Sequence, residues 1–268
     1  MASALTRNTA RLLRERVAKL PEDPEVEDLN QLLRLLATWR ARAIANTYIA
    51  HEGARVRSGP FEGMAYAGAT EGSQIARLLG VYEAGLHPHI RAFAAEGLDC
   101  LVDVGCAEGY YAVGLARMMP DLTVYAYDIS ETARQACAAL AARNDVSDRV
   151  IIGGEFKPDG FEAFAGRRAL VMVDAEGAEL DILQPALSPA LAGMNVIVET
   201  HDVFRPGSLA TLMERFSPTH SIVQVEQGQQ IIDMPPWLSE LSQLDQLLAI
   251  WEWRLAATPW LVMRPKSG

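Results

Sequence analysis

The stretch LVDVGCAEGYYAVGLA, residues 101–116, decides the fold expected for this chain. It begins as a short apolar segment that ends near an acid, Asp103. It then passes through Gly105 and Gly109 and returns to a helical pattern. A buried strand, a glycine turn and a helix in this order are typical of a parallel α/β sheet, in which the loop after the first strand contributes backbone to the ligand site.

Strand-like and helix-like segments alternate through the rest of the chain. The expected strands are residues 100–104, 124–127, 150–152, 169–173, 196–198, 221–225 and 260–263, and the expected helices are residues 112–118, 133–143, 178–183, 208–216 and 238–253. This alternation predicts a Rossmann-like α/β fold, with a mostly parallel sheet of seven strands and helices on both faces.

The first 98 residues predict a helical collar or lid that precedes the sheet domain of residues 99–268. Helical periodicity covers residues 5–20 and 26–50, with a break at two prolines between them. The apolar positions Leu29, Leu32, Leu33, Leu36 and Ile44 would share one face of the second helix. We expect this face to be buried against the main domain or against a second copy, which would make the protein a homodimer through its N-terminal helices.

Composition narrows the classes of partner. The 268 residues carry a net charge of −10, which argues against nucleic acid or an anionic membrane surface as a partner. No apolar run is long enough to span a membrane and no secretory leader is recognisable, so a cytoplasmic location is expected. Cys100, Cys106 and Cys137 are odd in number and lack CxxC spacing, which favours reduced, buried thiols.

The glycine loop does not match the two commonest phosphate-binding motifs. Ala107 and Tyr110 stand where a dinucleotide fingerprint requires its second and third glycines, and no Gly-Lys-Ser/Thr follows as in a P-loop. What remains is a pair of acids at two successive strand ends, Asp103 and Asp128. Carboxylates at these places suit a ligand with an ammonium group and a ribose diol, and S-adenosylmethionine has both.

At these residues the chain resembles a known family. VDVGCAEGYYAVGLA followed by YDIS is similar to motif I and the second acidic motif of class I S-adenosylmethionine-dependent methyltransferases. VMVDAEGAELDIL resembles the D-x-E-G-x-E stretch of the FkbM-like branch, many of whose members methylate oxygen on sugars or natural products. The resemblance covers about residues 99–202 and implies that the last of seven strands is antiparallel. It also implies that S-adenosylmethionine is held by Asp103, Gly105, Cys106, Ala107, Glu108, Gly109, Tyr110, Asp128, Ile129 and Asp174.

Ionisable residues follow two later strands. Asp174 and Glu176 come after one, and Glu199 and His201 come after the next, so all four are expected at one edge of the sheet as candidate catalytic residues. His201 is the most suitable base, because the ordinary pKa of an imidazole is about 6.5. We expect Glu199 to orient it and Asp174 to face the transferred methyl group.

A divalent cation is the alternative to a protein base. Asp174, Glu199 and Asp202 form a weaker candidate set for Mg²⁺, which would lower the pKa of an acceptor hydroxyl. The sequence favours no metal, since these acids lack a fixed ligand spacing. Glu179 and Asp181, in the following helix, are expected to be solvated partners of the helix dipole.

The sequence therefore predicts a methyltransferase that uses S-adenosylmethionine and a general base to methylate oxygen on a small polar, sugar-like or natural-product acceptor. A metal-dependent O-methyltransferase, an N- or carboxyl-methyltransferase and a cofactor-binding module without activity stay open. The acceptor is the only partner molecule that the sequence predicts, apart from the second copy.

Overall fold

A computed structural model describes residues 3–67, 73–226 and 234–266. Its centre is a sheet of seven strands in the order β3-β2-β1-β4-β5-β7-β6. The strands are β1 (Cys100–Val104), β2 (Thr123–Tyr127), β3 (Val150–Gly153), β4 (Ala169–Val173), β5 (Asn195–Glu199), β6 (His220–Val225) and β7 (Trp260–Pro265). The expected strands are therefore all present, with small differences at their ends.

The first five strands run parallel, and β7 is antiparallel to both β5 and β6. This arrangement confirms the predicted fold class, including the antiparallel last strand. The chain moves outward from β1 to β2 and β3, and then returns to place β4 on the other side of β1. The carboxyl ends of β1 and β4 therefore flank the point where the winding reverses, which is where ligands bind in open α/β sheets.

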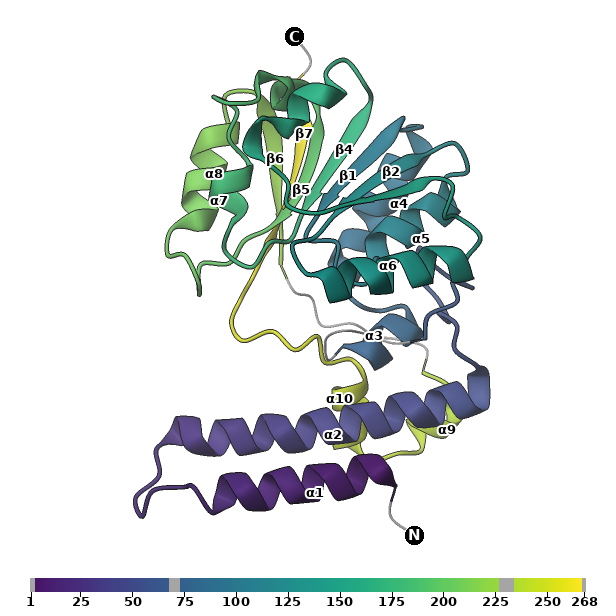
Figure 1. The fold of residues 1–268 in the computed structure, drawn as a ribbon, viewed down its shortest axis with the longest axis vertical. Coiled ribbons are helices and arrows are strands. Elements are labelled where there is room, and N and C mark those ends of the chain that lie inside the picture. Colours follow the sequence, from purple (N-terminus) through teal and green to yellow (C-terminus); the bar gives the residue numbers. More distant parts are fainter. Residues whose placement is uncertain (1–2, 68–72, 227–233, 267–268) are drawn as a thin grey trace.

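Helices cover both faces of the sheet (Figure 1). One face carries α4 (His87–Ala95), α5 (Tyr110–Met118) and α6 (Glu131–Arg143), and the other carries α7 (Glu179–Ile182), α8 (Ser208–Phe216), η2 (Pro158–Phe164) and η3 (Pro189–Gly193). Alternate residues of the buried strands point to opposite faces. In β1, Leu101 packs into the core on the first face, whereas Val102 packs into the core on the second.

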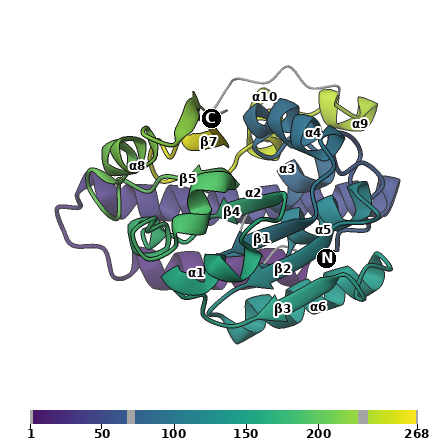
Figure 2. The same ribbon diagram turned by 90° about the horizontal axis from the view of Figure 1, so that it is seen from above.

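The collar lies across the carboxyl end of the parallel strands, as Figures 1 and 2 show. It consists of α1 (Ala4–Val17), α2 (Val26–Glu52), α3 (Gln74–Leu79) and η1 (Ala84–Leu86), joined by α9 (Pro236–Ser239) and α10 (Gln243–Ala249) from the later part of the chain. Arg40 on α2 donates two hydrogen bonds to Asp245 on α10, at 2.5 and 2.7 Å. The division at residue 98 stays a prediction, and α10 links the later chain to the collar.

The apolar face predicted for α2 is buried over only part of its length. Ile44 is buried in the core that also contains one face of the sheet, but Leu29, Leu33 and Leu36 are 52%, 65% and 40% exposed. In Figure 1 the first half of this 27-residue helix lies beside α1 and extends away from the sheet. A homodimer that covers this exposed row stays a prediction.

The prediction of one long helix over residues 238–253 is wrong. The chain forms α9 and α10 instead, and the segment from Trp251 to Pro259 has no regular structure. Ser242 accepts a hydrogen bond from the amide of Asp245 at 3.3 Å and so starts a new helix. The three cysteines are buried and free, as predicted. None of the helices in the described ranges is long and apolar enough to cross a membrane.

Candidate functional site

Two cavities open at the carboxyl ends of the parallel strands. The larger one, of about 460 Å³, lies over β1, β2 and β4, and the smaller one, of about 170 Å³, lies over β4 and β5. Asp174 and Glu176, in the loop after β4, line both cavities. A ligand in the larger cavity and one in the smaller cavity would therefore meet at these two residues.

The glycine loop forms one wall of the larger cavity, and no residue with a Cβ atom fits at its first glycine. Gly105 has a φ of +88°, and a Cβ atom built on it would lie 1.7 Å from the carbonyl oxygen of Asp174. The amides of Gly105 and Cys106 both donate to the carbonyl of Tyr127, at 2.9 and 3.0 Å. The loop is thus fixed between β2 and β4, with its backbone close to the cavity.

Asp128 lines the larger cavity beside the glycine loop. One of its carboxylate oxygens accepts a hydrogen bond from the amide of Ala107 at 3.0 Å, and the other accepts one from the amide of Ser130 at 2.7 Å. Both oxygens keep a further lone pair for a ligand. Ile129 lines the same cavity and is 82% exposed, so its side chain offers an apolar surface that nothing in the described chain covers.

The predicted residues Asp103, Cys106 and Gly109 do not line the larger cavity. Asp103 is buried beside α5, where burial, followed by the charges of Asp174 and Asp128, raises its pKa to about 8. Cys106 is buried, and Gly109 lies against Cys137, whose sulfur would be 2.7 Å from an added Cβ. These residues shape the turn from behind.

Glu108 and Tyr110 point toward the collar instead of the cavity. Glu108 is buried, pairs with Arg77 of α3 and accepts a hydrogen bond from the hydroxyl of Tyr66 at 2.5 Å. Tyr110 makes edge-to-face contacts with Phe61 and Tyr66, and also with two other tyrosines. The two side chains therefore attach the glycine loop to the collar.

Arg77 is a residue of the larger cavity that the sequence did not single out. It is 6% exposed, pairs with Glu108 and stacks over the ring of Tyr82, with 4.3 Å between the guanidinium carbon and the ring centroid. It reaches the cavity from the collar, about thirty positions before the glycine loop. No local pattern around it signals this contact, because the contact is made only by the folded chain.

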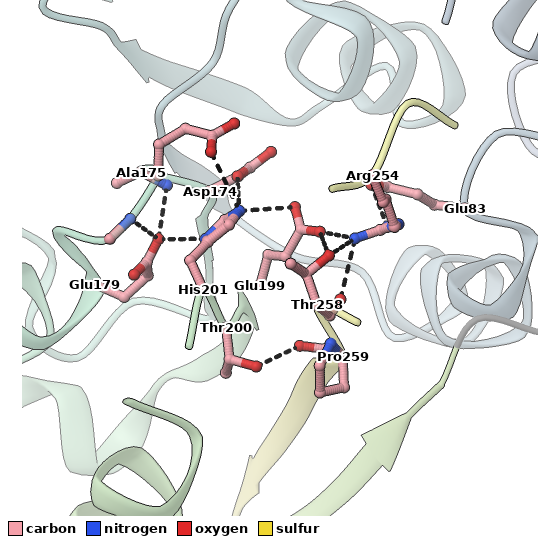
Figure 3. A network of polar contacts seen from close by, with 12 residues as sticks. Glu83, Asp174, Ala175, Glu179, Glu199, Thr200, His201, Arg254, Thr258 and Pro259 are labelled. Atoms are coloured by element: carbon pink, nitrogen blue, oxygen red, sulfur yellow. Dashed lines mark hydrogen bonds and ion pairs between the residues drawn. The ribbon is translucent and has the colours of Figure 1, made fainter. Parts of the chain in front are cut away.

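In the smaller cavity, His201 is held by Glu179 (Figure 3). The imidazole Nδ1 lies 2.8 Å from Glu179 Oε1, and the same oxygen accepts hydrogen bonds from the amides of Ala175 and Gly177 at 3.3 and 3.0 Å. Burial alone would raise the pKa of Glu179, but the bonds from His201 and Gly177 lower it overall. An ionised carboxylate only accepts, so Nδ1 carries a proton and Nε2 of the neutral ring has a free lone pair.

Nε2 of His201 faces three carboxylates at distances too long for direct hydrogen bonds. The nearest oxygens belong to Glu176 at 3.5 Å and to Asp174 and Glu199 at 3.7 Å each. Burial alone would lower the pKa of His201. The bond to Glu179 and the charges of the surrounding acids outweigh it, so the pKa lies above its ordinary value of 6.5.

The partner expected to orient His201 differs from the one observed. Glu199 Oε1 is engaged by Arg254 and by the hydroxyl of Thr258 at 2.6 Å. Glu179, expected to be solvated at a helix start, is fully buried and makes the short contact with His201. Its helix is a single turn that packs inward against the loop after β5, which no helical pattern in the sequence announces.

The predicted metal set is only partly brought together. The carboxylate of Asp202 lies at the N-terminus of α8. There it accepts hydrogen bonds from the hydroxyl of Ser208 at 2.5 Å and from the amide of Leu209 at 2.8 Å. A different group, Asp174, Glu176 and His201, places one ligand atom from each residue within 4.8 Å of the others. Two carboxylates and an imidazole could ligate a divalent cation.

Strained backbone is concentrated at these cavities. Across the described ranges, five residues other than glycine have positive φ, and four of them line a cavity: Glu83 and Trp253 in the smaller one, Ala107 in the larger one, and Glu176 in both. Such conformations cost roughly 1–3 kcal/mol each and cluster at functional sites. The loops here are therefore held in unfavourable conformations by the surrounding fold.

Known proteins similar in structure share little sequence with this chain. Neither a protein-family model nor a curated protein sequence matches the chain. An O-methyltransferase from Streptomyces achromogenes involved in tomaymycin synthesis, solved in complex with S-adenosylmethionine, is 12% identical, with 99% of this chain and 100% of that chain covered and a TM-score of 0.45. An O-methyltransferase from Bacillus cereus in complex with S-adenosylhomocysteine is 12% identical, with 98% and 100% covered and a TM-score of 0.45.

The contact between Glu179 and His201 predicts a specific titration. In an NMR titration of the histidine rings, His201 should titrate above pH 6.5, and Glu179→Gln should lower its pKa because the ring loses a negative partner. His220, whose pKa burial lowers, is the internal control and should not respond. Because the pKa of His201 is raised in the folded protein, the protonated ring stabilises the fold. This stabilisation is complete below the unfolded pKa of about 6.5 and is lost as the pH rises through the folded pKa. A His201 that titrates below 6.5, or that ignores the substitution, would contradict this account.

Proposed function

We propose that this protein is an S-adenosylmethionine-dependent methyltransferase that methylates an oxygen of a small acceptor, with His201 as the general base. The observation that carries the proposal is the junction at Asp174 and Glu176, where the larger cavity meets the smaller one beside the imidazole. The D-x-E-G-x-E stretch, which supplies both acids and Glu179, supports the narrower placement in the FkbM-like branch.

The residues of the larger cavity fit this cofactor. Gly105 leaves room for the amino-acid part, and the oriented carboxylate of Asp128 would accept hydrogen bonds from the ribose hydroxyls. Ile129 and Phe156 supply apolar surface for the adenine, and Arg77 supplies a cation for the carboxylate of the methionine part. When bound, S-adenosylmethionine supplies a methyl group on a positively charged sulfur.

The chain's own residues supply position and a proton acceptor. His201 Nε2 takes the proton of the acceptor hydroxyl, and Glu179 holds the ring in the tautomer that makes this nitrogen available. Glu179 also stabilises the imidazolium that forms. Glu199, fixed by Arg254 and Thr258, lines the same cavity with Oε2 3.7 Å from Nε2 of the ring. Activity should therefore rise with pH as His201 loses its proton.

A metal-assisted reaction is the second candidate, and one observation favours it. Asp174, Glu176 and His201 present ligand atoms close enough to share one divalent cation. In that case Nε2 would be a ligand and would not accept a proton. The two candidates thus assign opposite roles to the same lone pair, and an experiment can separate them.

A first test concerns the cofactor. Ile129→Ser should weaken S-adenosylhomocysteine binding by about tenfold, because the apolar surface that the adenine would cover is lost. Leu244→Ser on α10 is the matched control, since Leu244 is 65% exposed and lies outside both cavities. Isothermal titration calorimetry measures both variants. Equal affinity in the Ile129 variant and the wild type would contradict the proposed adenine position.

The second prediction concerns the base. With an acceptor identified by transfer of a labelled methyl group, His201→Gln should lower turnover by ~10²-fold or more, with cofactor affinity nearly unchanged. Dialysis against EDTA should leave wild-type activity intact. Loss of activity in EDTA with recovery in Mg²⁺ would replace the protein base by the metal candidate.

A further inference from the structure

The smaller cavity contains more acids than its cations neutralise. Five carboxylates line it, from Glu83, Asp174, Glu176, Glu199 and Glu252, against one guanidinium and one imidazole. The contacts of these acids with positively charged partners divide the cavity into two halves, one around Arg254 and one around His201.

In the first half, Arg254 is shared by three acids. Its guanidinium contacts Glu83 at 2.9 Å, Glu252 at 3.2 Å and also Glu199, and it donates to the carbonyl of Thr258 at 3.0 Å. Its donors are therefore directed at groups that surround it, as Figure 3 shows. Arg254 does not compensate the acids on the other side of the cavity.

In the second half, one imidazole faces Asp174, Glu176 and Glu179 as well as Glu199. Burial, followed by the charge of Glu83, raises the pKa of Asp174, as expected in a region of negative potential. The His201 side chain is only 5% exposed, and its Nε2 points into the cavity without a hydrogen bond from the described residues. A ligand that brings both a hydroxyl and a positive charge would complete this half.

The rest of the lining is apolar or aromatic. Tyr82 and Trp253 contribute aromatic rings, and Val203, Phe204 and Leu255 are 46%, 52% and 55% exposed around the same cavity. A bare metal ion needs none of this surface, whereas an organic cation with a hydrocarbon body would cover it. The cavity of about 170 Å³ limits that body to roughly one ring.

We infer that the acceptor is a small amino alcohol with an apolar or aromatic body, whose ammonium group binds Glu176 and Asp174 while its hydroxyl faces His201. Glu176 Oε2 and His201 Nε2 are 3.5 Å apart, a separation that a hydroxyl and an ammonium on neighbouring carbons can bridge. This inference rests on the proposed function, because it places the acceptor hydroxyl at the proposed base. The inferred acceptor is thus a cation, whereas a sugar-like acceptor would be uncharged.

Three probes of one shape test the charge. 2-Amino-1-phenylethanol, 1-phenylpropan-1-ol and mandelate share a ring and a hydroxyl and differ in a neighbouring ammonium, methyl or carboxylate group. Calorimetric titrations into the full chain, alone and saturated with S-adenosylhomocysteine, should give an affinity for the amine at least ~10-fold above that of the neutral alcohol. Mandelate should bind most weakly, and added salt should weaken only the amine.

Two variants locate the preference. Glu176→Gln should remove most of the tenfold preference for the amine while leaving the neutral alcohol unaffected, because the shape of the side chain is kept. Glu214→Gln makes the same charge change on the exposed surface of α8 and should keep the preference. A preference that survives Glu176→Gln would overturn the inference.

Other outcomes would also overturn it. These are equal binding of the three probes, a preference for mandelate, no binding of any probe, or binding of Mg²⁺ that Glu176→Gln abolishes. Failure of the proposed function is read separately. A protein that does not bind S-adenosylhomocysteine would refute the methyltransferase, whereas titration of the probes into the protein alone still decides the charge of the ligand.

Discussion

The contact between Gly105 and the backbone of Asp174 is the constraint on which the site depends. The two residues end neighbouring strands, β1 and β4, and no side chain fits between them. The amide of Asp174 also donates to the carbonyl of Val104 at 3.0 Å. Because the glycine loop lies directly against the β4 loop, the larger cavity ends where the smaller one begins. A bulkier residue at position 105 would separate these loops.

The sequence DAEGAE, residues 174–179, organises the second half of the site. Asp174 and Glu176 line the cavities. Gly177 adopts a φ of +104°, which residues with a side chain rarely adopt, and this turn brings Glu179 back beneath the loop. There one carboxylate oxygen of Glu179 accepts hydrogen bonds from two amides of the loop and from the ring of His201. One short motif thus fixes its own loop and the base on the next strand.

Local patterns in the sequence predict the sheet and part of the site. Strand periodicity, together with Gly105 and Asp128 at strand ends, places backbone at known positions in an α/β sheet, and these residues line the larger cavity. Side-chain direction within a tight turn is not a local property. The sequence places Glu108 in the ligand loop, yet its side chain turns to Arg77 on a helix whose position depends on the collar.

The partners of the smaller cavity were harder to predict for the same reason. Arg254 approaches Glu199 from a segment without regular structure, and Glu179 meets His201 across two strands. Such pairs follow from the packing of distant segments, and single-residue patterns contain no signal for them. The acids themselves were found because strand ends are recognisable. Their charge balance depends on Arg254, which only the folded chain brings to them.

The proposed function depends on one cofactor that links the two cavities at Asp174 and Glu176. A crystal structure with S-adenosylhomocysteine tests it most directly. The ribose should lie against Asp128 and the adenine against Ile129 and Phe156, with the sulfur at the opening beside Asp174, facing the cavity that contains His201. Electron density for the ligand at any other place, or a sulfur directed away from His201, would contradict the claim.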